Sequence, residues 1–180
     1  GEKDYDFNIQ QFGITPERDE VVDFSDGYYD VQQVVIAAEG SPISEATSVG
    51  ELADFNLGAA IGTTSLDYID DVIQPDTEAA VFDDNAAATA AFDAGQVDGI
   101  VYDLPTAYYI TAAEIPNSTI VGVLPQAGTE PEQLGMLFET DSPLIPCVNE
   151  ALATLRDDGT LAALQEEWLS AGGDIPTLSE

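Results

Sequence analysis

The sequence has no histidine, one cysteine and only three lysine or arginine residues among 180. Without histidine, Ser-His-Asp and Cys-His catalysis and most zinc sites are excluded. The single Cys147 can form neither an internal disulfide nor a cysteine metal cage. Three cations cannot neutralise a row of phosphates, which excludes nucleic-acid binding and attachment to an anionic membrane surface. We therefore expect no metal and no cofactor.

Long hydrophobic runs are also missing, and none approaches the length of a membrane span. No charged-then-apolar leader is present, and the chain opens at Gly1 without an initiator Met. We expect a processed or truncated product. Hydrophobic residues still make up 44% of the chain, including seven Phe, seven Tyr and one Trp. This content predicts a folded core, in one ordinary domain or two small lobes.

The charge is strongly one-sided, with 35 acidic residues and a formal net charge of −32. Repulsion at this density destabilises a compact state in dilute buffer, and salt screens it over a Debye length of roughly 3 Å at 1 M. Acid-rich, lysine-poor surfaces suit a salt-loving host. An acidic extracytoplasmic protein from an ordinary host fits the composition equally well.

Strands and helices alternate through the middle of the chain, which predicts an α/β unit with a mostly parallel sheet. We expect strands at 31–38, 57–61, 78–82, 97–102 and 118–124 and helices at 66–73, 85–94 and 105–113. A second unit would pair strands 4–10 and 134–139 with helices 146–157 and 161–170. Trp168 is expected to anchor the last helix in the core, and the tail after Gly172 is expected to be loose.

A turn with anion-binding character follows the strand at 57–61. It consists of Gly62, Thr63, Thr64 and Ser65 and opens the next helix. Free N–H groups and hydroxyl donors at a helix start can bind an anion. The alternative interpretation is ordinary helix capping by Thr or Ser, which is very common.

Two charged residues complement this turn. Asp103 ends the strand at 97–102, where ligands sit in open α/β sheets, and a carboxylate there can hold an ammonium group. Alternatively, Asp103 only caps the next helix. Arg18 presents a fork of donors that matches a carboxylate, or else pairs with a nearby acid such as Glu17 or Asp19. Together these groups complement the α-carboxylate and α-ammonium of an amino acid.

Several segments resemble the signature of bacterial extracellular solute-binding proteins of family 3, the polar amino acid-binding subunits of ABC importers. The similarity extends over nearly the whole chain. The matching segments are Gly13-Ile14-Thr15-Pro16-Glu17-Arg18, Val22-Asp23-Phe24-Ser25-Asp26-Gly27-Tyr28-Tyr29, Ile61-Gly62-Thr63-Thr64, Ala94–Asp103, Val148–Leu152, Asp158–Leu161 and Trp168-Leu169.

The resemblance implies an α/β fold of the periplasmic-binding-protein-like type II, which closes around its ligand by a hinge between two lobes. Arg18 would grip the ligand α-carboxylate with help from Thr63, Thr64 and Ser65, and Asp103 would accept the α-ammonium with a contribution near Gln11 and Gly13. The two crossings would include Tyr28, Tyr29 and Gln32 on one segment and Glu130 and Gln133 on the other. Residues 33–129 would form lobe 2, and residues 1–32 and 130–180 part of lobe 1.

One departure from the family pattern concerns the first lobe. Its opening strand-helix segment, which carries aromatic residues that pack on the ligand side chain, is absent here. The chain is therefore expected to be a C-terminal fragment with one complete lobe plus part of the other. Bare sheet edges would invite pairing with another chain.

The resemblance implies a non-enzymatic protein that delivers a polar amino acid to a membrane permease. It would work in the periplasm or outside the cell, with a lipid anchor on the full-length precursor. Two alternatives share the fold: an enzyme such as a cyclohexadienyl dehydratase, and the sensing domain of a receptor. A catalytic acid aimed at the ligand would identify the first alternative, and a transmembrane segment in the gene the second.

Overall fold

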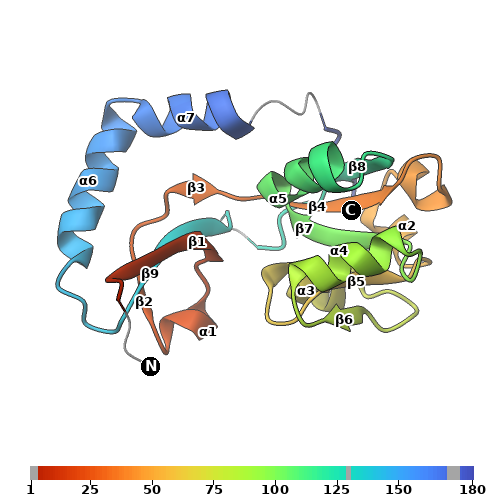
Figure 1. Ribbon diagram of the computed structural model, residues 1–180, viewed down its shortest axis with the longest axis horizontal. Coiled ribbons are helices and arrows are strands. Elements are labelled where there is room, and N and C mark those ends of the chain that lie inside the picture. The colour runs from red at the N-terminus through yellow and green to blue at the C-terminus, as the bar shows by residue number, and fades with distance from the viewer. Residues whose placement is uncertain (1–3, 129–130, 170–174) are drawn as a thin grey trace. The chain divides into compact units, whose positions relative to one another are not determined.

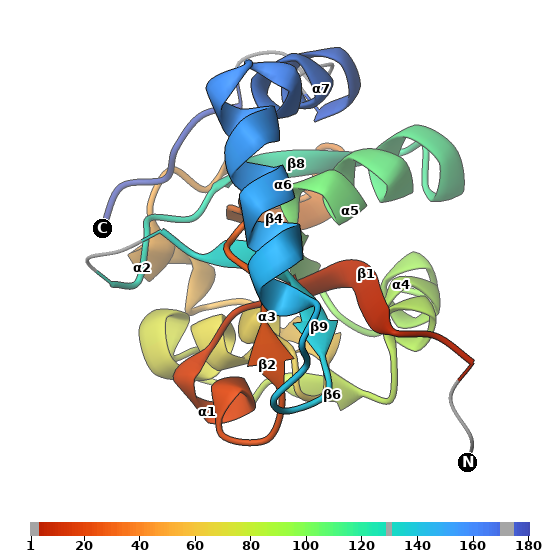
Figure 2. The same ribbon diagram turned by 90° about the vertical axis from the view of Figure 1, so that its left-hand side faces the viewer.

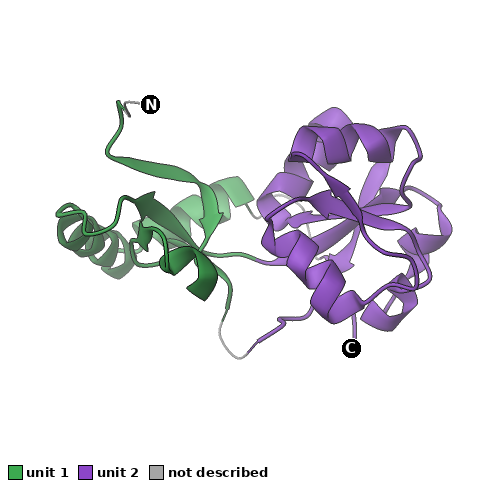
Figure 3. Ribbon diagram, turned by 90° about the horizontal axis from the view of Figure 1, so that it is seen from below, with its two compact units in different colours: residues 1–31, 130–171 green, residues 32–129, 172–180 purple. Residues whose placement is uncertain are grey.

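The computed structural model describes residues 4–128, 131–169 and 175–180. The chain divides into two compact units, coloured separately in Figure 3. Unit 1 comprises Gly1–Val31 and Glu130–Ala171, and unit 2 comprises Gln32–Thr129 and Gly172–Glu180. Each unit is described by itself below. No helix in the described ranges is both long and apolar enough to cross a membrane.

Unit 2 contains a five-stranded sheet with helices on both faces. Its strands are β4 (Gln33–Ala38), β5 (Leu57–Ala60), β6 (Ala80–Phe82), β7 (Gly99–Asp103) and β8 (Ser118–Val123). Its helices are α2 (Val49–Leu52), α3 (Thr64–Tyr68), α4 (Asn85–Asp93) and α5 (Leu104–Tyr109), with a 3-10 turn η1 (Pro42–Glu45) and π-helical extensions η2 (Ile69–Ile73) and η3 (Ile110–Glu114). Figure 1 shows α3, α4 and α5 beside these strands.

Alternate side chains of β4 enter two separate cores. Val35 and Ala37 pack in a cluster with apolar residues of η1, α2, α3 and η2 on one face of the sheet. Val34 and Ile36 pack in a second cluster with residues of α4, α5 and η3 on the other face. A strand buried on both faces reads as a continuous apolar run, which explains the sequence of 34–38.

The sheet is mixed, and the prediction of a mostly parallel sheet needs a correction. The strand order is β6-β5-β7-β4-β8, in which β5 is parallel to β6 and β7 but β4 is antiparallel to β7 and β8. Helices link β5, β6, β7 and β8 in succession, and such crossovers return the chain in the same direction. The connection 39–56 leaves β4 and enters β5 at the same end of the strands. Strand β4 therefore runs opposite to the other four strands.

The C-terminal tail belongs to unit 2, so the prediction that it is loose and part of the first lobe was wrong. Ser179 and Thr177 form parallel bridges with Ser48 and Val123. The side chain of Leu178 is only 3% exposed and lies in the core cluster that contains Val35. Burying one leucine side chain contributes about 1.5–3 kcal/mol, and backbone hydrogen bonds such as that from Leu178 N–H to Val123 O at 2.9 Å add to it.

Unit 1 is built on a four-stranded sheet with β9 (Gln133–Phe138) at its centre. The other strands are β1 (Phe7–Gly13), β2 (Asp23–Phe24) and β3 (Tyr29–Asp30), and all three pair antiparallel with β9. The helices are α1 (Pro16–Asp19), α6 (Ile145–Asp157) and α7 (Thr160–Leu169). Figure 2 shows α6 and β9 from the side of this unit.

The core of unit 1 is small. Among the described residues of the unit, the buried apolar ones include Val31, Leu134, Phe138 and Leu152, and the ring of Phe7 lies 5.4 Å from that of Phe138. Helix α7 has no buried residue, and Trp168 is 70% exposed, which contradicts its predicted role as a core anchor. Leu164 is exposed as well, and Leu161 and Leu169 are only half-buried, so α7 adds little to the core.

Candidate functional site

Gln33 joins three of the predicted ligand residues in unit 2. Its Nε2 donates to Oδ1 of Asp103 at 2.7 Å and to Oγ1 of Thr64 at 3.1 Å. Its Oε1 accepts from Oγ of Ser65 at 2.7 Å. Because Asp103 lies next to Gln33 across the β4–β7 ladder, strand pairing brings residues 70 positions apart into contact. The cluster therefore holds hydroxyls and a carboxylate around one amide.

The hydrogen bonds of the Asp103 carboxylate show whether this residue caps the next helix. Asp103 is the residue before the first turn of α5, but its carboxylate makes no capping hydrogen bond there. Pro105 removes one of the N–H groups that a cap would serve. The carboxylate accepts from Gln33 instead. Asp103 is therefore not the simple helix cap that the sequence left open.

The residues of the turn before α3 have different hydrogen-bond partners. Thr63 is the N-cap: its Oγ1 accepts from the N–H of Leu66 at 3.2 Å and donates to the carbonyl of Ala60 at 2.7 Å. Gly62 has a φ of 69°, a left-handed conformation that suits glycine. Thr64 and Ser65 do no capping and point their hydroxyls at Gln33. The capping interpretation thus holds for Thr63, and anion binding by Thr64 and Ser65 stays a prediction.

Arg18 and Gly13 lie together in unit 1. Thr15 caps α1 by accepting from the N–H of Arg18 at 3.3 Å, and Pro16 occupies the first turn, as the sequence predicts. The guanidinium folds back, and its Nη1 donates to the carbonyl of Gly13 at 2.7 Å. Gln11 lies in the irregular part of β1 with a φ of 56° and is exposed.

The predicted crossing segments lie side by side in unit 1. The N–H of Tyr28 donates to Leu134 O at 2.9 Å, and Tyr29 pairs with Leu134 in the β3–β9 ladder. Gln133 Nε2 donates to Asp30 Oδ1 at 2.6 Å. Gln32 is exposed, and its carbonyl accepts from Leu104 N–H in unit 2. The predicted hinge residue Glu130 lies outside the described residues.

Helix α6 holds the turn that leads into β3, an arrangement that the sequence did not predict. Asn149 and Asp26 exchange two hydrogen bonds, at 2.9 Å from the Asp26 N–H and at 3.0 Å from Asn149 Nδ2. Arg156 Nη2 donates to Gly27 O at 2.7 Å. A Cβ at Gly27 would lie 2.6 Å from the side chain of Gln133, so only glycine fits there.

Gln33 is the other residue that sequence reasoning missed. It lies in a strand that is otherwise apolar, and its side chain is only 6% exposed. A buried amide requires hydrogen-bond partners, because an unpaired one costs free energy. A glutamine inside a predicted core strand is therefore a signal that could have directed attention to this position.

Tyr102 supports the strand that carries Asp103. Its hydroxyl donates to Asn85 O at 2.7 Å and lies 3.0 Å from Oγ1 of Thr89, which ties β7 to α4. Burial raises the pKa of Tyr102 to about 12, although the hydrogen bond from Thr89 acts in the opposite direction. The folded protein therefore holds this proton more tightly than the unfolded chain does.

We predict that stability falls between pH 10 and pH 12 and that Tyr102→Phe removes part of this fall. The unfolded tyrosine loses its proton near pH 10, so the folded state is favoured below that pH and loses about 1–2 kcal/mol by pH 12. Tyr102→Phe should also cost about 0.5–1.5 kcal/mol at pH 7, because it removes the hydrogen bond to the Asn85 carbonyl and the contact with the Thr89 hydroxyl. Urea unfolding at pH 7 and pH 11 measures both effects. Tyr109→Phe, at an exposed position, is the control. An equal loss from pH 7 to pH 11 in the wild type and Tyr102→Phe would contradict the prediction.

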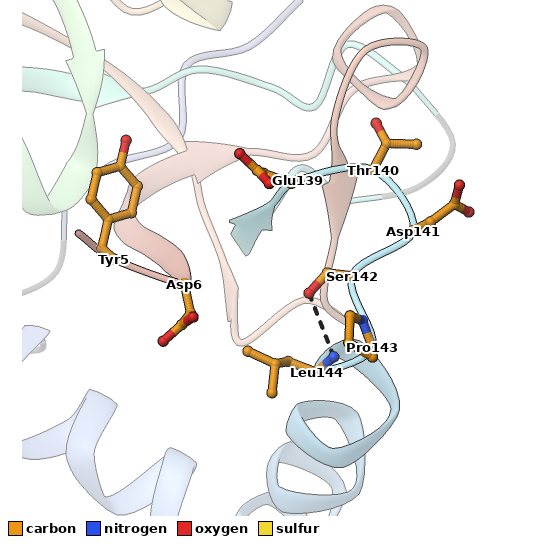
Figure 4. A pocket seen from close by; sticks show the side chains of 8 residues that line it. All are labelled: Tyr5, Asp6, Glu139, Thr140, Asp141, Ser142, Pro143 and Leu144. Carbon is orange, nitrogen blue, oxygen red and sulfur yellow. Dashed lines mark hydrogen bonds between the residues drawn. The ribbon is translucent and has the colours of Figure 1, made fainter. Parts of the chain in front are cut away.

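A hollow of about 600 Å³ lies elsewhere in unit 1, around the end of β9 (Figure 4). None of the residues predicted to bind the ligand lines it. The described residues include no group of three or more acidic, histidine or cysteine side chains placed to hold a metal ion. The lining residues are Tyr5, Asp6, Glu139, Thr140, Asp141, Ser142, Pro143 and Leu144.

The sequence matches the family model described as bacterial extracellular solute-binding proteins, family 3, over residues 1–171. ABC transporter arginine-binding protein 1 of Escherichia coli (strain K12) is 29% identical over 169 residues, covering 91% of this chain and 66% of that protein. The glutamine-binding protein GlnH of Bacillus subtilis (strain 168) is 28% identical over 167 residues, covering 92% and 58%. The chain thus spans about three fifths to two thirds of these relatives.

Solved structures show the same fold. A mutant of ArgBP from T. maritima superposes with a TM-score of 0.74 at 29% identity, covering 93% of this chain and 70% of that one. The ancestral amino acid-binding protein AncCDT-1, described as a precursor of cyclohexadienyl dehydratase, gives 0.73 at 28% identity, covering 92% and 68%. The predicted class, an α/β fold of the periplasmic-binding-protein-like type II with one lobe plus part of the other, is confirmed.

Proposed function

Because the chain belongs to the bacterial extracellular solute-binding proteins of family 3, we propose that it is the amino acid-binding component of an ABC importer. Members of this family are solute-binding proteins rather than enzymes. The observation that carries the proposal is the hydrogen-bonded cluster of Thr64, Ser65 and Asp103 around Gln33. It holds hydroxyl donors and a carboxylate at the ends of adjacent elements, as an amino acid ligand requires.

The proposed roles follow from the charges. Arg18 binds the ligand α-carboxylate, and its bond to the Gly13 carbonyl at 2.7 Å orients the guanidinium. Thr64 and the 63–65 turn add donors to the same carboxylate, and Asp103 accepts from the α-ammonium. Gln11 and Gly13 contribute next to Arg18. Hydrogen bonds to charged groups are worth about 1.5–3 kcal/mol each, so these few contacts suffice for specific binding.

The proposed second lobe is residues 33–129 together with the tail 175–180, and residues 1–32 with 130–169 are the proposed part of the first. The segments that contain Tyr28, Tyr29 and Gln32 and that contain Glu130 and Gln133 serve as the hinge. Support comes from the ladder between 28–31 and 132–134, which fixes the two segments to each other within unit 1. Closure around the ligand then changes the surface that a permease recognises.

The partner is an ABC permease, and the protein acts in the periplasm or outside the cell, with a lipid anchor on its precursor. Exposed apolar residues of the edge strand β1, such as Phe7 and Ile9, favour self-association through the sheet edge of the first unit. The acidic surface favours a salt-rich environment.

We predict that neutral polar or cationic amino acids bind at least about tenfold more tightly than glutamate or aspartate. Of the three cations in the sequence, Arg18 is assigned to the α-carboxylate, Arg156 donates to the Gly27 carbonyl, and Lys3 lies outside the described residues. An acidic side chain would enter a negative field without a partner, and a buried unpaired carboxylate is expensive. The relatives named for arginine and glutamine binding are consistent with this preference.

Isothermal titration calorimetry on the complete protein, with arginine, lysine, glutamine, glutamate and aspartate, measures this preference. D-arginine serves as a control for binding by charge alone, because it carries the same charges as L-arginine with the opposite configuration at Cα. Tighter binding of glutamate or aspartate would show the charge argument to be wrong. If no amino acid binds, the proposed function itself fails.

A further inference from the structure

We infer that Gln33 is a positioning residue of the amino acid site, whose side-chain amide sets the polarity of the groups that meet the ligand. The inference rests on the proposed function. It adds a residue that contacts Thr64, Ser65 and Asp103 without itself being charged or placed in a turn.

The amide of Gln33 uses all of its principal bonding directions inside the cluster. Its two N–H donors have two acceptors, Asp103 Oδ1 at 2.7 Å and Thr64 Oγ1 at 3.1 Å. Its oxygen accepts from Ser65 Oγ at 2.7 Å, and Ser65 is only 5% exposed. A planar amide held at three points cannot rotate without breaking bonds. Gln33 and Ser65 therefore form a buried support under Thr64 and Asp103.

The direction of these bonds determines what the outer groups can do. Thr64 accepts from Gln33, so the single proton of its own hydroxyl is directed to another acceptor, as a ligand carboxylate requires. Asp103 receives an N–H at one oxygen, which orients the carboxylate as an acceptor for an ammonium group. The Gln33 amide thus leaves the Thr64 hydroxyl as a hydrogen-bond donor and the Asp103 carboxylate as an acceptor toward the ligand.

A double-mutant cycle in ligand affinity tests this inference in the complete protein. Gln33→Met keeps the length of the side chain but removes both donors and the acceptor, and should weaken binding about tenfold or more. Thr64→Val alone should also cost about tenfold. Because Gln33 acts through Thr64, the double variant should bind within about threefold of Gln33→Met. Additive losses, about a hundredfold together, would overturn the inference.

Two further variants separate positioning from a general loss of structure. Ser65→Ala removes only the anchor of the Gln33 oxygen and should weaken binding by about three- to tenfold, with no further loss when combined with Gln33→Met. It keeps the test valid if Gln33→Met does not fold. Gln96→Met makes the same chemical change at an exposed position of unit 2 and should leave affinity unchanged.

A measurement without ligand decides the geometry even if no amino acid binds. The side-chain N–H signals of Gln33 in a ¹⁵N NMR spectrum should exchange slowly with water. Asp103→Ala should shift one of the two protons and Thr64→Val the other. Fast exchange and shifts unaffected by either variant would overturn the inference, whereas a failure of all amino acids to bind would refute only the proposed function.

Discussion

Replacing Arg18 with alanine is expected to abolish amino acid binding, with a loss of affinity of at least about 100-fold. The guanidinium offers two parallel charge-assisted hydrogen bonds to a carboxylate, and hydrogen bonds to charged groups are worth about 1.5–3 kcal/mol each. The other arginine, Arg156, lies on α6 and donates to Gly27 O, so it is committed to holding that turn. In a chain with a net charge of −32, removing the cation also leaves the ligand carboxylate facing a negative field.

Two variants make the Arg18 test specific. Arg18→Lys keeps the charge but loses the planar fork, and should retain binding at an affinity between the wild type and Arg18→Ala. Glu17→Ala changes the neighbouring, exposed residue of the same short helix and should bind like the wild type. Calorimetry gives the affinities, and circular dichroism verifies that each variant is folded. If Arg18→Ala binds within threefold of the wild type, the assignment of the carboxylate site is wrong.

Thermal stability is expected to rise by about 10 °C between dilute buffer and 2 M potassium chloride. Acidic residues lie next to one another on the described surface, as in the exposed pairs Asp70-Asp71, Asp83-Asp84 and Asp157-Asp158. Salt screens repulsion between exposed charges, over roughly 3 Å at 1 M. A gain of about 3–4 kcal/mol corresponds to this shift, since 1 kcal/mol moves the melting temperature by about 2–4 °C for a chain of this size.

Comparison at two pH values separates charge screening from the general effect of salt on apolar burial. Near pH 4 part of the carboxylates are protonated, so the salt-induced gain in melting temperature should shrink. Differential scanning calorimetry at pH 7 and pH 4, each with and without salt, gives the four melting temperatures. A melting temperature that does not rise with salt at pH 7, or an equal rise at both pH values, would contradict the role of repulsion.

The sequence by itself determined the features that depend on neighbouring residues. The cap of α1 by Thr15 and the α/β alternation of unit 2 were both predicted, because capping, turn chemistry and hydrophobic period are local properties. The family was also recognisable, since its motifs are short segments in a fixed order. Arg18, Thr64 and Asp103 could therefore be named as candidates from the sequence.

Only the tertiary structure decided what depends on residues far apart in the chain. Asp103 accepts from Gln33 rather than capping α5, because the β4–β7 ladder places the two side by side. Leu178 is buried and Trp168 exposed, the reverse of what their positions suggested, because burial depends on which surface lies opposite. The direction of β4 likewise follows from its neighbours in the sheet. A pattern along one segment shows that a side chain can pack or bond, but its partner is set by the fold.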